Sequence, residues 1–171
     1  LNVINYLLGQ TMKLGLLVFI ILFQPEIRRL LEQVGSSKLG FLFGRKVPDT
    51  RINQCINAVV SACTEMAKKR IGVLIVFERD IRLDDTIQTG TRVDAEVSYE
   101  LLTNIFYPNT PLHDGAVIIR NGRIVAASCM LPLTTKRNLS RDLGMRHRAS
   151  IGVSEITDAV AVTVSEETGS I

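Results

Sequence analysis

Two short segments of the chain combine residue types that could do chemistry on a phosphate ester. The first places His113 beside Asp114, directly before an apolar run that is typical of a strand. An imidazole next to a carboxylate can serve as metal ligand and general base, and Gly115 would let a ligand approach the backbone closely. Because Asp-Gly before a strand is also a common turn, this segment alone leaves a purely structural interpretation open.

The second segment is Arg146-His147-Arg148, in which two guanidinium groups flank an imidazole. Guanidinium groups can bind phosphate oxygens in bidentate fashion, although a solvated basic turn would have the same composition. Ser165 and Glu166 follow the last apolar run, and ligands gather at the carboxyl ends of strands in α/β sheets. These residue types together indicate a metal and phosphate site. Neither GxxxxGK[ST] nor GxGxxG occurs, so no P-loop or Rossmann site is predicted.

The bulk composition indicates one ordinary globular domain within the 171 residues, of which 46% are hydrophobic and 22% charged. A net charge of +3, no Trp and three Tyr do not predict a nucleic-acid partner. Cys55, Cys63 and Cys129 lack CxxC spacing. They indicate apolar core residues in a reducing compartment, and neither a zinc site nor a disulfide framework is predicted.

The beginning of the chain is unusually apolar. Residues 14–23 read LGLLVFIILF, a run shorter than the roughly 20 residues that a full membrane span needs. Arg28 and Arg29 follow it closely, as is typical of a cytoplasmic flank. We expect the end of a transmembrane helix from a longer protein, with a buried core helix as the alternative. The predicted division is 1–34 for this helix and its juxtamembrane segment, 35–48 for a linker, and 49–171 for the globular domain that carries the two chemical segments.

Hydrophobic periodicity predicts interleaved helices and strands over residues 49–171. Asn121-Gly122 lies between two apolar runs and predicts a tight β-hairpin. The predicted fold is therefore α/β, a mixed central sheet flanked by helices, preceded by an N-terminal transmembrane-derived helix. The expected elements are a helix from Asp49 or Thr50 to about Arg70 with apolar residues at Ile52, Ile56, Val59, Val60, Cys63 and Ala67, a buried strand at 71–77, a charged loop at 78–85, a helix at 94–105, hairpin strands at 116–120 and 123–129, a helix at 146–156 and a strand at 159–164.

The two chemical segments together resemble the signature motifs of diadenylate cyclase domains. The matching motifs are Asp-Gly-Ala at 114–116, Arg-His-Arg at 146–148, CxLPL at 129–133, Gly-Val-Ser-Glu at 152–155 and Val-Ser-Glu-Glu-Thr-Gly at 164–169. The apolar N-terminus followed by FQPEIRR is similar to the membrane-anchored class of this family. The resemblance extends over essentially the whole chain.

This resemblance implies condensation of two ATP into cyclic di-AMP and two pyrophosphates, between two face-to-face monomers. It further implies a divalent metal, Mg or Mn, a location at the cell membrane with the catalytic domain in the cytoplasm, and regulatory protein partners. The implied catalytic residues are Asp114, which would help activate the 3′-hydroxyl, and His113, with both as metal ligands. The implied ATP-binding residues are Gly115, Ala116, Met130, Leu131, Arg146, His147, Arg148, Ser165 and Glu166.

Two positions depart from the family pattern. Met145 stands where the family often has Thr, which removes a hydroxyl contact to phosphate, and Met130 stands where it often has Tyr. A methionine still offers a polarizable face to a purine. The alternative functions are a module that senses an adenine nucleotide without turning it over, and a membrane scaffold that binds only proteins.

Overall fold

The computed structural model describes residues 6, 10, 12–15, 18–19, 21–24, 49–136 and 143–171. The chain forms two units, Leu1–Gly44 and Arg45–Ile171. The described residues of the first unit are helical. The predicted membrane helix over residues 14–23 is therefore described only in part, and the predicted linker at 35–48 lies outside the described residues. Within the described residues, no helix has both the length and the apolar character that crossing a bilayer requires.

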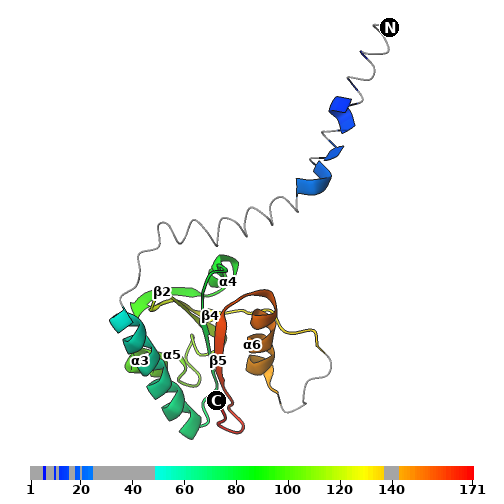
Figure 1. The fold of residues 1–171 in the computed structure, drawn as a ribbon. Coiled ribbons are helices and arrows are strands. Elements are labelled where there is room, and N and C mark those ends of the chain that lie inside the picture. Colours follow the sequence, from blue (N-terminus) through cyan, green and yellow to red (C-terminus); the bar gives the residue numbers. More distant parts are fainter. Residues whose placement is uncertain are drawn as a thin grey trace. The chain divides into compact units, whose positions relative to one another are not determined.

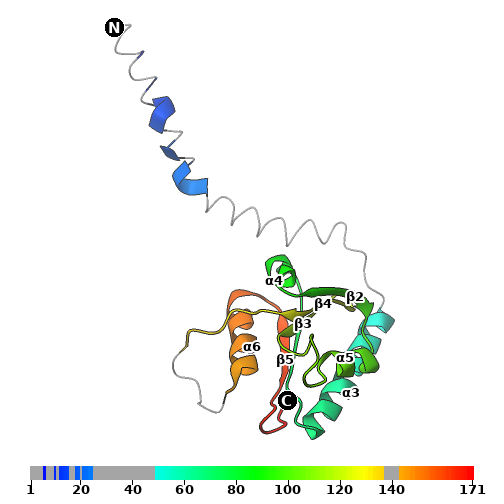
Figure 2. The same cartoon turned by 180° about the vertical axis from the view of Figure 1, so that it is seen from behind.

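The second unit is built on a five-stranded mixed sheet with the strand order β2-β4-β3-β1-β5. Figures 1 and 2 show α3 and α5 covering one face of this sheet and α6 the other. The prediction of a mixed sheet flanked by helices is confirmed. The elements are α3 (Asp49–Lys68), β1 (Val73–Phe77), α4 (Asp84–Gln88), β2 (Thr91–Glu96), α5 (Tyr99–Ile105), β3 (Ala116–Arg120), β4 (Arg123–Cys129), α6 (Met145–Ile156) and β5 (Val160–Val164).

Strand β1 is buried on both faces, as its continuous apolar run predicts. Val73 and Ile75 belong to the core shared with α3 and α5. Leu74 and Val76 belong to the core shared with α6. Because successive side chains of a strand point to opposite faces, one five-residue strand links the two cores.

The predicted hairpin is present. Strands β3 and β4 pair antiparallel, with Arg120 opposite Arg123. Asn121 has φ 51° and Gly122 has φ 72°. Positive φ at both central residues is what a two-residue hairpin turn of type I′ requires, and Asn and Gly adopt it at low cost.

The predicted helix at 94–105 is wrong over its first part. Residues 94–96 belong to β2, and the helix α5 begins at Tyr99, where the Ser98 hydroxyl accepts a hydrogen bond from Leu101 N at 3.2 Å. The short helix α4 was not predicted either, because its residues fell in the expected charged loop and the stretch after it. Strand β2 forms because it can pair with β4, a tertiary contact that local propensity does not report.

The helix α3 confirms the predicted element, but not all of its apolar residues are buried. Ile52, Ile56 and Val60 are exposed, whereas Cys55 and Cys63 lie in the core. The sheet packs against the face of the helix that carries these two cysteines. Burial raises the pKa of the Cys63 thiol to about 11. All three cysteines are free and buried, as predicted.

Candidate active site

The topology gathers the ends of all five strands at one edge of the sheet. Strands β1 and β3 run parallel, so both begin at this edge. Strands β5 and β4 run antiparallel to these two, so both end there, and β2, antiparallel to β4, begins there. Segments that are far apart in the sequence therefore meet at this edge: Gly72, Thr89, His113–Gly115, Cys129–Leu131 and Ser165–Glu167.

A strained turn and a bulged strand hold Asp114 at this edge. Gly115 has φ +105°, and a Cβ there would come within 2.7 Å of the Ser128 carbonyl carbon. Between the pairs Ala116–Cys129 and Ile118–Ala126, β4 holds one residue more than β3, and Ser128 lies in this bulge with φ 57°. The Ser128 hydroxyl donates to the Asp114 carbonyl at 2.6 Å. Bulges often aim a side chain at an active site, and here the backbone of Asp114 is fixed while its side chain stays exposed.

The ring of His113 is held by a backbone carbonyl. Its Nδ1 lies 2.6 Å from the Thr110 carbonyl oxygen. Because a carbonyl only accepts, this contact places a proton on Nδ1, so in the neutral tautomer the lone pair is on Nε2. A histidine that donates its second ring N–H to a carbonyl is the usual arrangement of a metal ligand.

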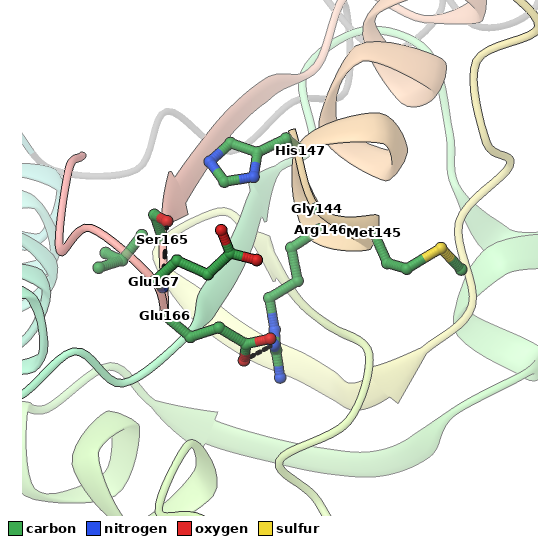
Figure 3. Close-up of a pocket in the computed structure, with 8 residues that line it drawn as sticks. Gly144, Met145, Arg146, His147, Ser165, Glu166 and Glu167 are labelled. Atoms are coloured by element: carbon green, nitrogen blue, oxygen red, sulfur yellow. Dashed lines mark hydrogen bonds and ion pairs between the residues drawn. The ribbon is translucent and has the colours of Figure 1, made fainter. Parts of the chain in front are cut away.

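Arg146 lies in the first turn of α6 and contacts two other segments. Its Nη1 donates to Glu166 Oε2 at 2.7 Å, and its Nη2 donates to the His113 carbonyl at 3.3 Å. Figure 3 shows this guanidinium meeting the Glu166 carboxylate, which comes from the segment after β5. The Arg146 side chain is only 20% exposed, and its buried Nε has no hydrogen-bond partner among the described residues. That N–H is available to an anion.

His147 is the second group with an unused nitrogen. Its Nδ1 is buried and has no partner within the part of the chain that the structure describes. In Figure 3 its ring and the Glu167 side chain both point into the space between α6 and the end of β5. The helix N-terminus beside this space favours negative charge, because the first N–H groups of a helix have no acceptor within the helix.

The turn after β5 is closed by Ser165. The Ser165 hydroxyl accepts from the backbone N–H groups of Glu167 at 3.3 Å and Thr168 at 3.2 Å. The Ser165 backbone bonds to Gly169 and Ser170 as well, each at 2.9 Å. The turn therefore holds the two glutamates at the edge of the sheet, and only the proton of the Ser165 hydroxyl remains for a ligand.

Two pockets lie at this edge and share Met145 and Arg146. The larger has a volume of about 470 Å³, within the range of small-molecule sites, and the smaller about 80 Å³. The larger is lined by Leu74, Thr89, Asp114, Gly115, Ser128, Cys129, Met130, Leu131, Leu133, Met145, Arg146 and Ala149. The smaller is lined by Gly144, Met145, Arg146, His147, Val164, Ser165, Glu166 and Glu167.

One wall of the larger pocket is fixed by Thr89, a residue that no sequence motif singled out. The Thr89 hydroxyl accepts from Met130 N at 2.9 Å and donates to the Thr86 carbonyl at 2.6 Å. The contact joins positions 41 residues apart, from the end of α4 to the end of β4. No local sequence signal predicts it. Gly72 was not singled out either, for the same reason.

Most of the predicted site residues come together. Asp114, Gly115, Met130 and Leu131 line the larger pocket, and His147, Ser165 and Glu166 line the smaller. Three predicted residues line neither of these two pockets. His113 contributes its carbonyl to Arg146, Ala116 lies fully in the core, and Arg148 donates its Nε to the Leu143 carbonyl at 3.3 Å.

Comparison with known proteins identifies the family. Residues 60–171 match the family described as DisA bacterial checkpoint controller nucleotide-binding, abbreviated DAC. Cyclic di-AMP synthase CdaA of Bacillus subtilis is 48% identical over all 171 residues, and a diadenylate cyclase of Listeria monocytogenes is 44% identical over the same length. The chain belongs to the diadenylate cyclase domain family. It spans 62% of the length of each of these two relatives.

Solved structures of related chains agree with this membership. The crystal structure of DacA from Staphylococcus aureus, a double mutant, superposes with a TM-score of 0.67 at 51% identity, covering 68% of this chain and 78% of that chain. A hypothetical membrane spanning protein from Bacillus cereus superposes with a TM-score of 0.65 at 37% identity, covering 88% of this chain and 72% of that chain. The five-stranded sheet and its flanking helices are therefore those of the diadenylate cyclase domain family.

Proposed function

We propose that this chain is the catalytic part of a diadenylate cyclase, which condenses two ATP into cyclic di-AMP and releases two pyrophosphates. The observation that supports this most directly is that Asp114 and Arg146 line one pocket. A carboxylate that can take a proton thus shares a pocket with a guanidinium that can hold a phosphate, in a chain of the diadenylate cyclase family.

In this proposal Asp114 acts as the base. The 3′-oxygen of one ATP attacks the α-phosphorus of the other, and the proton of that hydroxyl passes to the Asp114 carboxylate. The bond from the α-phosphorus to the oxygen that bridges to the β-phosphorus breaks, and pyrophosphate leaves with the electron pair. The backbone contacts of Asp114 keep its carboxylate at the pocket, and such positioning supplies much of the rate in phosphoryl transfer.

The nucleotide is proposed to bind across both pockets. Gly115, Met130 and Leu131 would border the nucleoside in the larger, more apolar pocket. Arg146 belongs to both pockets and would hold the phosphates, with its Nε, which has no partner among the described residues, as one donor. The remaining predicted ATP-binding residues are Ala116, which is buried at the start of β3, and His147, Arg148, Ser165 and Glu166, which we assign to the phosphates.

A divalent cation, Mg or Mn, fits the residues present. His113, whose Nδ1 contacts the Thr110 carbonyl, would offer its Nε2, and Asp114, the next residue in the sequence, would offer carboxylate oxygens. Among the described residues, no group of three His, Cys, Asp or Glu side chains forms a metal site. Few protein ligands are typical of Mg²⁺ that is shared with substrate phosphates. When bound, the cation would neutralise charge on the phosphates.

The proposed setting is a pair of chains at a membrane. Each new bond needs a hydroxyl from a second, separately held nucleotide, which two face-to-face monomers provide by symmetry. The apolar run at 14–23 is proposed to be part of a membrane anchor, with the catalytic domain in the cytoplasm. The similarity to a Bacillus cereus chain described as a membrane spanning protein supports this setting. Regulatory proteins are proposed partners, and nucleic acid is not.

The test is product analysis after incubation of the chain with ATP and Mn²⁺. We expect cyclic di-AMP and pyrophosphate in a ratio of one to two, and no product with an ATP analogue that lacks the 3′-hydroxyl. ATP binding without release of pyrophosphate would support the second candidate, a nucleotide-sensing module. A chain that neither binds nor converts ATP would contradict both.

A further inference from the structure

Gly72 packs against the ion pair between Arg146 and Glu166. It is buried in the short connection between α3 and β1. A Cβ built on Gly72 would lie 2.5 Å from Arg146 Nη1, 2.8 Å from Glu166 Oε2 and 2.9 Å from Arg146 Cζ. Carbon atoms do not approach neighbours this closely, so a methyl group there would occupy the place of the ion pair.

The neighbours of Gly72 set it apart from other tightly packed glycines in the domain. The nearest atoms to a Cβ on Gly152 or Gly115 are backbone atoms, which cannot move without disturbing the fold. The three nearest atoms to a Cβ on Gly72 all belong to the ends of two side chains, Arg146 and Glu166. A methyl group at Gly72 would thus move these two groups and leave the backbone in place.

Such a methyl group would displace the Arg146 guanidinium, and Arg146 lines both pockets. The Arg146 guanidinium is held by Glu166 on one side and by the His113 carbonyl on the other. We infer that Gly72 is a positioning residue for Arg146, because the absence of a side chain there sets where the guanidinium lies between the two pockets. The catalytic consequence of this inference rests on the proposed function, whereas the position of Arg146 does not.

The first test reads that position directly. In the nitrogen–proton spectrum of the full chain, the Arg146 Nε–H resonance is assigned by its loss in Arg146→Lys. We expect Gly72→Ala to shift this resonance. The matched control is Gly15→Ala, where a Cβ meets nothing within 4 Å and no shift is expected. An unmoved resonance in a folded Gly72→Ala variant would overturn the inference, whether or not the chain is a cyclase.

The second test is a double-mutant cycle on activity. Misplacement of one phosphate-binding group can cost about 100-fold in rate, so we expect Gly72→Ala to lower kcat/KM by about 10- to 100-fold. In an Arg146→Ala background the same change should have less than about a twofold effect, because the displaced group is already absent. An equal loss of kcat/KM in both backgrounds would show that Gly72 does not act through Arg146. A wild-type chain without cyclase activity would refute the proposed function and leave the spectrum to decide the role of Gly72.

If Gly72→Ala folds poorly, the same double-mutant cycle can be measured on stability against urea instead of activity. Since the methyl group would meet Arg146 and Glu166 first, Arg146→Ala should restore the urea midpoint of the Gly72→Ala chain toward that of Arg146→Ala alone. Failure of that rescue would place the clash in the backbone and overturn the inference.

Discussion

Asp114 lies between a histidine whose ring is held by a carbonyl and a glycine whose φ of +105° would strain any other residue. Its carbonyl accepts the Ser128 hydroxyl, so its own backbone is held as well. At the scale of single residues, Asp114 is thus held by backbone contacts while its side chain stays exposed. This arrangement keeps its carboxylate in place without burying the charge, which would be costly.

For this reason Asp114→Asn should remove catalysis while leaving the fold and the ATP affinity nearly unchanged. The amide has the shape of the carboxylate but cannot take the proton, and general-base catalysis typically contributes about 100-fold or more. We expect cyclic di-AMP formation to fall at least about 100-fold, measured by chromatography alongside titration with a fluorescent ATP analogue. Asp85→Asn, at an exposed position of α4, is the matched control. Retention of more than about a tenth of the wild-type turnover would refute the role of Asp114 as base.

Contacts between elements decide the shape of the pocket and the way α6 packs. Thr89 at the end of α4 holds Met130 at the end of β4, and Gly152 of α6 lies against the segment that follows β4. Thr134 N in that segment also donates to the Arg148 carbonyl of α6 at 3.1 Å. The helix that carries Arg146 and His147 is therefore anchored to the same chain segment that borders the larger pocket.

At the pocket wall, Thr89→Val should raise the KM for ATP several-fold with little change in kcat. Valine has the shape of threonine but cannot accept the Met130 N–H, so the wall next to the proposed nucleoside site would loosen. Steady-state kinetics measure the effect. Thr89→Ser keeps the hydroxyl and should restore the wild-type KM, and a Thr89→Ser chain as impaired as Thr89→Val would argue against this role.

In α6, Gly152→Ala should destabilise the whole domain. A Cβ there would overlap the Pro132 carbonyl oxygen and lie 2.8 Å from Thr134 N, and neither backbone atom can move freely. Overpacking of this kind typically costs about 1–3 kcal/mol of unfolding free energy, measurable by urea denaturation. The matched control is Gly144→Ala, where the nearest atom to a Cβ is His147 Nδ1 at 3.9 Å. Equal unfolding free energies for the two variants would contradict the packing explanation.

At the scale of the whole molecule, the proposed site would bind one ATP, but cyclic di-AMP contains two adenylates. The proposed reaction therefore requires two chains, with each site completed by the nucleotide of the other. The proposed pocket is suited to this arrangement, because it is open at the edge of the sheet and Asp114 is exposed there.

The two-chain mechanism predicts that specific activity depends on enzyme concentration. Cyclic di-AMP formed per enzyme should rise with concentration at saturating ATP and Mn²⁺, and level off once the dimer is saturated. A dilution series combined with light scattering provides the measurement. Constant specific activity over a concentration range in which light scattering detects only monomer would exclude the two-chain mechanism.

The sequence alone determined the elements whose signals are local. The turn at Asn121-Gly122 depends on two residues that adopt positive φ easily, and β1 follows from an unbroken apolar run. The motifs around Asp114 and Arg146 were also recognisable, because the site chemistry depends on residue types that stand next to each other. Their membership in one site could be inferred only from family resemblance.

Only the tertiary structure decided which surfaces meet. Residues 94–96 joined a strand instead of the predicted helix because β4 offers them a pairing partner, and Ile52, Ile56 and Val60 stayed exposed because the sheet packs against the other side of α3. The contacts of Gly72 and Thr89 likewise join segments distant in the sequence. Such contacts depend on where whole elements are placed, and a short stretch of sequence has no energetic preference that reports them.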